Sequence, residues 1–188
     1  MRIISGSSKG KKILDPRDLN TRPLKDLTKE SVFNILAHSH KFNVILKNSN
    51  ILDLFSGVGS FGLECLSRGS RHVTFIENYN NVLIVLKKNI LNLGYQENST
   101  IMENNIMNNL NFKTFEKKFD VIFLDPPYRE KALSSILNNI IKSNILNNHG
   151  IIIIHRHKKE EDEFPKKFNI IEKKTYGISK VIFGNYFK

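Results

Sequence analysis

The amino-acid sequence predicts an α/β fold, with helices on both faces of a largely parallel sheet and a short N-terminal arm or hairpin. Short apolar runs alternate with segments whose apolar residues recur at helical spacing, which is the pattern of βαβ units. One run, residues 119–124, is apolar at nearly every position, as expected of a central strand buried on both faces. Polar residues gather just after several runs, and a parallel sheet of this kind binds its ligands beyond the carboxyl ends of its strands.

The N-terminal third contains two predicted elements before the first strand. Residues 1–22 are basic and punctuated by Gly and Pro, which indicates a hairpin or an extended arm. Residues 27–37 carry apolar side chains at helical spacing, with Asp26 or Thr28 as the candidate N-cap. A strand at residues 50–55 then leads directly into a glycine-rich turn.

The remaining elements alternate as βαβ units do. Helices are predicted at residues 61–67, 80–93 and 132–141, and Gly94 is placed to end the second of them. Strands are predicted at residues 71–77, 99–102, 119–124 and 151–154. Residues 168–175 and 180–187 predict a closing hairpin around Tyr176-Gly177, which adds an antiparallel pair to the sheet.

The length and the charge limit the kinds of protein this can be. The chain has 188 residues, enough for one domain with its own core, and a formal net charge of +11. We expect a single domain, with residues 1–40 as an N-terminal arm and helix and residues 41–188 as the core. The charge favours a polyanionic partner, because lysine and arginine on phosphates release counterions. Asn, Lys and Ile are plentiful throughout, so a compositional bias of the genome explains the charge equally well.

Several classes of protein are disfavoured. No apolar run approaches the roughly 20 residues of a membrane span, and the start lacks the layout of a signal peptide. The one cysteine, Cys65, permits no intramolecular disulfide, and the six histidines show no metal-ligand spacing. We therefore expect no metal and no membrane partner. We expect a monomer in a bacterial cytoplasm or an organelle matrix.

A glycine loop follows the first strand. Gly57, Gly59 and Gly62 have G-x-G-x-x-G spacing, and glycine is needed where a backbone turns closely against a ligand. Alone, the loop fits a tight turn or a dinucleotide site equally well. Glu77, at the end of the second strand, can accept both hydroxyls of a ribose. Asp53, before the glycines, suits the cationic amino-acid tail of S-adenosylmethionine better than a pyrophosphate.

The end of the third strand adds two candidates, since Asn105 and Ile106 are placed to hydrogen-bond and pack against an adenine. The full set predicted to bind this cofactor is Asp53, Phe55, Ser56, Gly57, Gly59, Glu77, Asn78, Asn105 and Ile106.

The fourth strand runs into Asp125-Pro126-Pro127-Tyr128. Two prolines cannot continue a central strand, so they make a rigid loop at its end. An Asp carboxylate and a backbone carbonyl can accept the N–H groups of a base's exocyclic amine, which turns its lone pair toward a sulfonium methyl group. Tyr128 can stack on an unpaired or flipped base. We predict these four residues as the catalytic loop of an amine methyltransferase.

The sequence resembles the small bacterial-type ribosomal RNA methyltransferases that modify the 2-amino group of a guanine in small-subunit RNA. The resemblance runs nearly end to end. It is carried by residues 2–6, Thr21-Arg22-Pro23, residues 53–69, the catalytic loop and Tyr176-Gly177. The Thr-Arg-Pro motif is the family-specific part, because the catalytic loop is shared with other amine methyltransferases.

The resemblance implies a Rossmann-like methyltransferase sheet with S-adenosylmethionine as the methyl donor. It implies small-subunit ribosomal RNA, or the assembling small subunit, as the partner. The RNA-facing residues it implies are Arg2, Lys9, Lys11 and Arg22.

Two features depart from the family's pattern. Lys25, Leu27 and Lys29 stand where the family usually has arginine and aspartate, and residues 155–157 replace an acidic stretch. We interpret His155 and His157 as solvated or RNA-adjacent, and residues 158–163 as a solvated loop.

Two other functions stay open. One is a DNA adenine methyltransferase that shares the catalytic loop. The missing target-recognition domain and the Thr-Arg-Pro motif count against it. The other is a non-catalytic RNA-binding factor in ribosome assembly. The intact residues Asp53, Gly57, Glu77 and Asp125 count against that reading.

Overall fold

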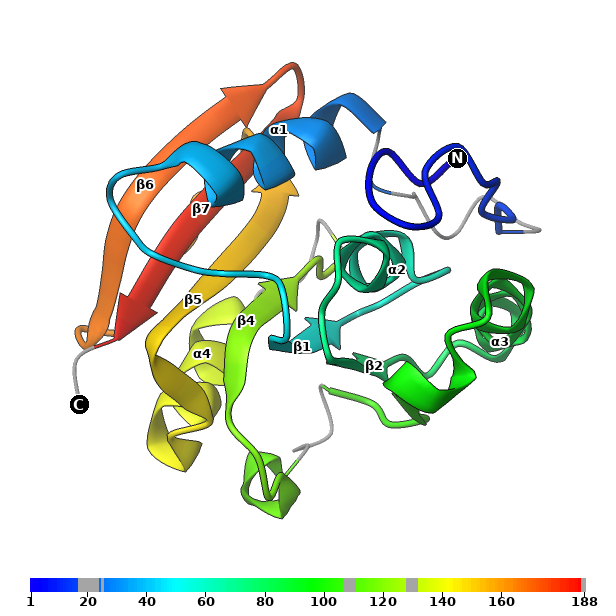
Figure 1. Ribbon diagram of the computed structural model, residues 1–188. Coiled ribbons are helices and arrows are strands. Elements are labelled where there is room, and N and C mark those ends of the chain that lie inside the picture. The colour runs from blue at the N-terminus through cyan, green and yellow to red at the C-terminus, as the bar shows by residue number, and fades with distance from the viewer. Residues whose placement is uncertain (17–23, 25, 107–110, 128–131, 187–188) are drawn as a thin grey trace.

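The computed structural model describes residues 1–16, 24, 26–106, 111–127 and 132–186, and its strands form one sheet in the order β3-β2-β1-β4-β5-β7-β6 (Figure 1). The strands of this part of the chain are β1 (Asn50–Leu54), β2 (His72–Ile76), β3 (Ser99–Met102), β4 (Phe119–Leu124), β5 (Leu146–His157), β6 (Phe168–Tyr176) and β7 (Ser179–Tyr186). Strands β1 to β5 pair in parallel, whereas β7 is antiparallel to both β5 and β6. The predicted α/β fold and its closing hairpin are therefore confirmed.

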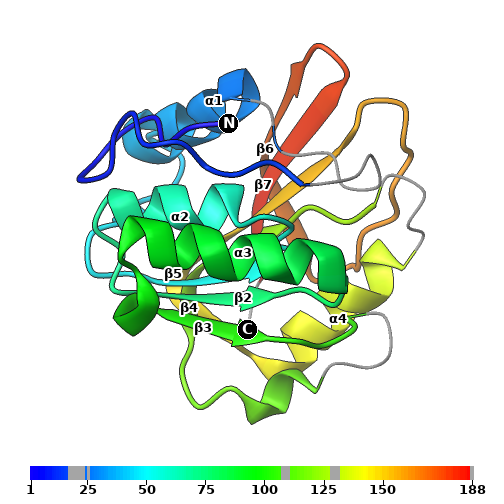
Figure 2. The same cartoon turned by 90° about the vertical axis from the view of Figure 1, so that its right-hand side faces the viewer.

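Helices cover both faces of the sheet. The described helices are α1 (Asp26–His38), α2 (Ser60–Ser67), α3 (Asn80–Leu93) and α4 (Leu133–Ser143), with short 3-10 turns η1 (Gln96–Asn98) and η2 (Phe112–Thr114). Figure 2 shows α2 and α3 on one face and α4 on the other, and two separate apolar cores fill these layers. None of the helices in the described ranges is long and apolar enough to cross a membrane.

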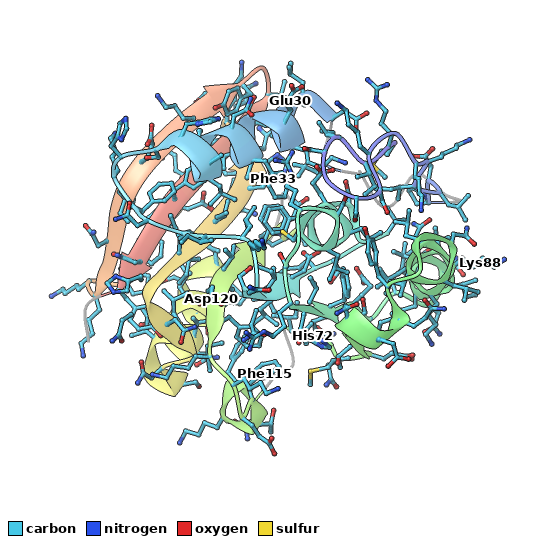
Figure 3. The ribbon with its side chains drawn as sticks, in the orientation of Figure 1. Glu30, Phe33, His72, Lys88, Phe115 and Asp120 are labelled. Atoms are coloured by element: carbon cyan, nitrogen blue, oxygen red, sulfur yellow. The ribbon has the colours of Figure 1, made fainter. Side chains whose placement is uncertain are left out.

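Helix α1 packs its apolar side over the same face as α2 (Figure 1). Phe33 is fully buried and stacks on Phe61 of α2, with 5.2 Å between the ring centroids. In Figure 3, Phe33 lies on the inner side of α1 and Glu30 on its outer side. In the apolar spacing from which this helix was predicted, Val32, Phe33 and Leu36 are buried, whereas Leu27 is 72% exposed.

Strand β5 is longer than the predicted residues 151–154. It begins at Leu146, because that residue pairs with Phe119 ahead of a register shift in the β4–β5 ladder. It continues to His157, because β7 pairs with it as far as the couple His157–Ser179. The prediction was wrong at both ends, since polar residues occupy the irregular start and the carboxyl end of this strand.

The N-terminal segment forms the predicted hairpin. The Ile3 N–H donates to the Lys11 carbonyl at 2.9 Å, and Arg2 and Lys12 form an antiparallel bridge. Glu64 of α2 holds the hairpin: its carboxylate oxygens accept the N–H groups of Ile4 at 2.7 Å and Ser5 at 2.9 Å. A buried carboxylate thus satisfies two backbone donors that a hairpin edge would otherwise leave unpaired.

Glu64 also joins helix α1 to this contact. Its carboxylate lies 2.8 Å from the Nε of Arg68 and 3.8 Å from the Nζ of Lys29, whose side chain is fully buried. Lys29 Nζ donates to the Arg2 carbonyl at 2.8 Å. Burial lowers the pKa of Lys29, and the Glu64 and Asp26 carboxylates oppose this. Lys29, which departs from the family's pattern, is therefore buried in the fold and does not face a solvent-borne ligand.

The close approach of Gly6 in the hairpin to Ser67 of α2 gives a prediction. Gly6 has φ +87°, and a Cβ there would lie 1.8 Å from the Ser67 carbonyl oxygen. Gly10 has φ +84°, with nothing within 4 Å of its added Cβ. We expect Gly10→Ala to cost about 1 kcal/mol of backbone strain, and Gly6→Ala to cost roughly 3 kcal/mol or more because the hairpin must leave α2. Urea unfolding measures both, and equal losses would contradict this packing.

Candidate active site

Four parallel strands are in register at one level of the sheet, near their carboxyl ends. The residues in register at this level are Leu54, Ile76, Leu124 and Ile154. The next residue of each strand therefore emerges at the same edge. These four residues are Phe55, Glu77, Asp125 and His155. Three of them, Phe55, Glu77 and Asp125, were predicted site residues, and the structure brings them to one edge of the sheet.

The glycine loop after β1 has a left-handed backbone at three positions. Phe55 has φ 62°, Gly57 φ 56° and Gly59 φ 87°. A positive φ is uncommon in a bulky residue and is kept only where the surroundings enforce it, which is frequent at ligand sites. Ser56 helps to enforce it, because its hydroxyl donates to the Asp53 carbonyl at 2.6 Å. Gly62 serves packing, since its added Cβ would meet the Phe75 ring at 2.3 Å.

Asp53 lies beneath this loop and is 1% exposed. Its Oδ2 accepts the Gly62 N–H at 3.0 Å, in the first turn of α2. Burial raises the pKa of Asp53 well above its ordinary value, the Gly62 N–H opposes this, and the charges of Asp125 and Glu77 raise it further. The carboxylate thus holds the start of α2 under the loop. Its predicted contact with an amino-acid tail stays a prediction.

Glu77, at the end of β2, is bound by three backbone donors. Its Oε2 accepts the Gly57 N–H at 2.8 Å, and its Oε1 accepts those of Asn78 at 2.8 Å and Tyr79 at 3.0 Å. These bonds fix the orientation of the carboxylate and tie β2 to the glycine loop. A carboxylate has about four acceptor sites, so about one remains for a hydroxyl group of a ligand.

The other predicted cofactor residues lie nearby. Asn78 is exposed, Asn105 is half-buried after β3, and Ile106 is 7% exposed in the apolar core on the α4 side. Their contacts with an adenosine group stay predictions.

The described part of the loop after β4, residues 125–127, is held at two points. The Asp125 N–H donates to the Leu54 carbonyl at 3.3 Å, which places the start of the loop against β1. Pro126 is buried and Pro127 is exposed, and the Pro127 carbonyl accepts from Arg156 Nη1 at 3.1 Å. Tyr128 lies outside the described residues.

His155 was expected to be solvated or RNA-adjacent, and the first of these is wrong. It is 5% exposed, its Nδ1 lies 2.7 Å from Asp125 Oδ1, and its Nε2 lies 2.9 Å from Ser179 Oγ. The reason is that β5 continues past the predicted strand end and β7 packs alongside it.

Residues 158–163 were expected to be a solvated loop, which fails at Asp162. Arg156 of β5 and Lys180 of β7 are paired across the two strands, so two buried cations lie next to each other. Asp162 compensates them, with its carboxylate oxygens 2.8 Å from Arg156 Nε and 3.2 Å from Lys180 Nζ. Buried cations need such a partner.

The candidate RNA residues divide into two groups. Arg2, Lys9 and Lys11 are exposed on the N-terminal hairpin, consistent with a role in binding a polyanion. Arg22, together with Thr21 and Pro23, lies outside the described residues.

Sequence reasoning missed Ser179 and Asp162 and assigned no role to Arg156. His155 could have been found, because it follows an apolar strand directly, as Glu77 and Asp125 do. Ser179 and Asp162 carry no such signal, since they reach the site only through the antiparallel pairing of β7 and the loop before β6.

Comparison with known proteins identifies similar chains. The family model described as "Conserved hypothetical protein 95" matches residues 1–185. The chain is 33% identical over 183 residues to "Putative rRNA methyltransferase YlbH" of Bacillus subtilis, covering 96% of both chains. It is 33% identical to "Ribosomal RNA small subunit methyltransferase D" of Buchnera aphidicola, covering 92% of this chain and 86% of that one. The structure of "Putative methyltransferase yhhF" from Escherichia coli superposes with a TM-score of 0.82 at 26% identity, covering 99% and 97% of the two chains.

The burial of Asp53 gives a prediction about pH. Because the pKa of Asp53 is raised in the folded protein, the unfolded chain releases the carboxyl proton at a lower pH than the folded protein does. The stability that protonated Asp53 contributes is therefore lost as pH rises from the ordinary pKa of 3.8 through the pKa of the folded state. Asp53→Asn keeps an oxygen to accept the Gly62 N–H and removes the titration. Urea unfolding should therefore show Asp53→Asn gaining on the wild type as pH increases toward neutral. Glu97→Gln, at an exposed position, is the control and should run parallel to the wild type. A constant difference for Asp53→Asn would contradict this account.

Proposed function

We propose that this chain is an S-adenosylmethionine-dependent methyltransferase of small-subunit ribosomal RNA. The premise is that the chain belongs to the family described as "Conserved hypothetical protein 95". We further propose that it methylates the exocyclic 2-amino group of a guanine. The observation that carries the proposal is the position of the Asp125 loop. It leaves the sheet beside the glycine loop, and the Asp125 N–H is bound to the last residue of β1.

The glycine loop and Glu77 fit S-adenosylmethionine. The left-handed backbone at Gly57 and Gly59 keeps side chains away from the end of β1, where the methionine portion would lie. The oriented carboxylate of Glu77 would accept the ribose hydroxyls. When bound, this cofactor supplies an electrophilic methyl group on a sulfonium.

Asp125 acts on the target amine. An amine conjugated to a base ring has a delocalised lone pair and is a weak nucleophile. Asp125 Oδ1 faces His155 and the side chain is 19% exposed, so the carboxylate can still accept an N–H of the amine at the site. A backbone carbonyl of the same loop would accept the second N–H. Together they direct the lone pair at the methyl group, which is catalysis by positioning and electrostatics.

The choice of RNA rests on two supports. Both curated relatives described above carry ribosomal RNA methylation in their names. The exposed side chains of Arg2, Lys9 and Lys11 lie on the N-terminal hairpin. This hairpin is hydrogen-bonded to α2, the helix that follows the glycine loop. A phosphate backbone bound there would lie against the element that also carries the cofactor loop.

Asp125→Ala tests the catalytic assignment. We expect binding of S-adenosylmethionine, measured by calorimetry, to stay near the wild-type value. Methyl transfer should fall by about 100-fold or more, because the acceptor of the amine N–H is lost. Glu116→Ala, on the exposed loop before β4, is the control and should transfer at the wild-type rate. Asp125→Ala with full transfer would refute the assigned role.

The substrate class is tested by transfer from labelled donor to naked small-subunit RNA, assembled small subunits and duplex DNA. We expect label on one or both RNA substrates. Label on DNA alone would overturn the RNA assignment in favour of a DNA adenine methyltransferase. Failure to bind S-adenosylmethionine would overturn the enzyme assignment in favour of a non-catalytic assembly factor.

A further inference from the structure

Three polar side chains form a hydrogen-bonded chain across three neighbouring strands. Asp125 follows β4, His155 belongs to β5 and Ser179 begins β7. His155 Nδ1 lies 2.7 Å from Asp125 Oδ1, and its Nε2 lies 2.9 Å from Ser179 Oγ. A carboxylate only accepts hydrogen bonds, so Nδ1 carries the proton and donates to Asp125. In the neutral imidazole, Nε2 then accepts from the Ser179 hydroxyl, which fixes the tautomer.

The hydrogen-bonded series Ser179–His155–Asp125 runs from the interior to the candidate active site. His155 and Ser179 are each 5% exposed, whereas the Asp125 side chain is 19% exposed. A hydrogen bond to a charged acceptor is strong, and the shielding of its donor strengthens it further. The orientation of the imidazole is thus set by packing and by Ser179. It is transmitted to Asp125, the carboxylate that we place at the target amine.

The backbone of the same loop is fixed by a separate contact. Arg156, the next residue of β5, is 1% exposed and donates to the Pro127 carbonyl at 3.1 Å. Its guanidinium is held in turn by Asp162 at 2.8 Å. Since Arg156 holds the loop and Pro126 restricts the backbone after Asp125, the main freedom left to Asp125 is rotation of its side chain. That rotation is what His155 opposes.

We propose that His155 is a positioning residue for methyl transfer. By donating to Oδ1 of Asp125 it turns the other carboxylate oxygen, Oδ2, toward the target amine. Among the described residues Oδ2 has no hydrogen-bond partner. This inference rests on the proposed function, because it assumes that Asp125 receives the amine. A misplacement of a reacting group by about 1 Å can cost about 100-fold in rate, so loss of this bond affects the chemical step.

Two substitutions separate the hydrogen bond from the bulk of the ring. In His155→Asn the amide nitrogen takes the place of Nδ1 and can still donate to Asp125. In His155→Gln the longer side chain carries its amide toward Ser179 instead. We expect kcat about 10- to 100-fold lower for His155→Ala and His155→Gln, and within about threefold of wild type for His155→Asn. His149→Ala, at the exposed far end of the same strand, is the control and should have wild-type kcat.

The readouts distinguish positioning from folding. KM for RNA and Kd for S-adenosylmethionine should stay near wild type in all three His155 variants, because neither substrate touches the imidazole. Added imidazole should raise the transfer rate of His155→Ala by filling the vacated space. If His155→Ala fails to fold, the contrast between the asparagine and glutamine variants at matched thermal stability gives the same answer. Equal kcat for these two variants would overturn the proposal, and so would wild-type kcat in His155→Ala.

Asp125→Ala is measured in parallel. If it is inactive while His155→Ala is fully active, only the positioning role fails. If Asp125→Ala is itself active, the role proposed for Asp125 fails and this inference fails with it. If the wild type transfers no methyl group to RNA, the proposed function fails.

Discussion

The constraint on which this structure depends is the common register of β1, β2, β4 and β5. Parallel pairing keeps Leu54, Ile76, Leu124 and Ile154 in register, and all four are fully buried. Sliding any one strand would move buried side chains out of the core, so the register is strongly specified. The residue that follows each of these four is therefore brought to the same edge. The glycine loop, Glu77 and the Asp125 loop meet there, where we propose that they bind the methyl donor and the target amine.

Helix α2 links this edge to the surface that we assign to RNA. Its first turn is bound by Asp53 through the Gly62 N–H, directly under the glycine loop. Its last turn carries Glu64, which binds the N-terminal hairpin and, through Lys29, helix α1. Both side chains are buried. Two backbone N–H groups compensate the Glu64 carboxylate, whereas burial raises the pKa of Asp53 and the one N–H of Gly62 opposes this. One short helix thus positions the cofactor loop and the basic hairpin relative to each other.

Most of the fold and half of the site were predictable from local patterns. Residues 80–93 were predicted as α3 without error, because apolar spacing and the terminal Gly94 agree. Glu77 and Asp125 were found because each follows a recognisable strand. The burial of His155 was not predicted, because it depends on β7 pairing with β5. Local sequence patterns do not give the order of strands in a sheet. Asp162 was missed for a related reason: its partners Arg156 and Lys180 become neighbours only through that antiparallel pairing.

The central claim is that the loop at the end of β4 presents an exocyclic amine of guanine to the methyl donor. Nucleoside analysis of methylated small-subunit RNA tests it most directly, because it identifies the atom that received the labelled methyl group. The account predicts that the label is recovered in guanosine methylated on its 2-amino group. Label recovered in adenosine, or on a ring atom or ribose oxygen of guanosine, would contradict it.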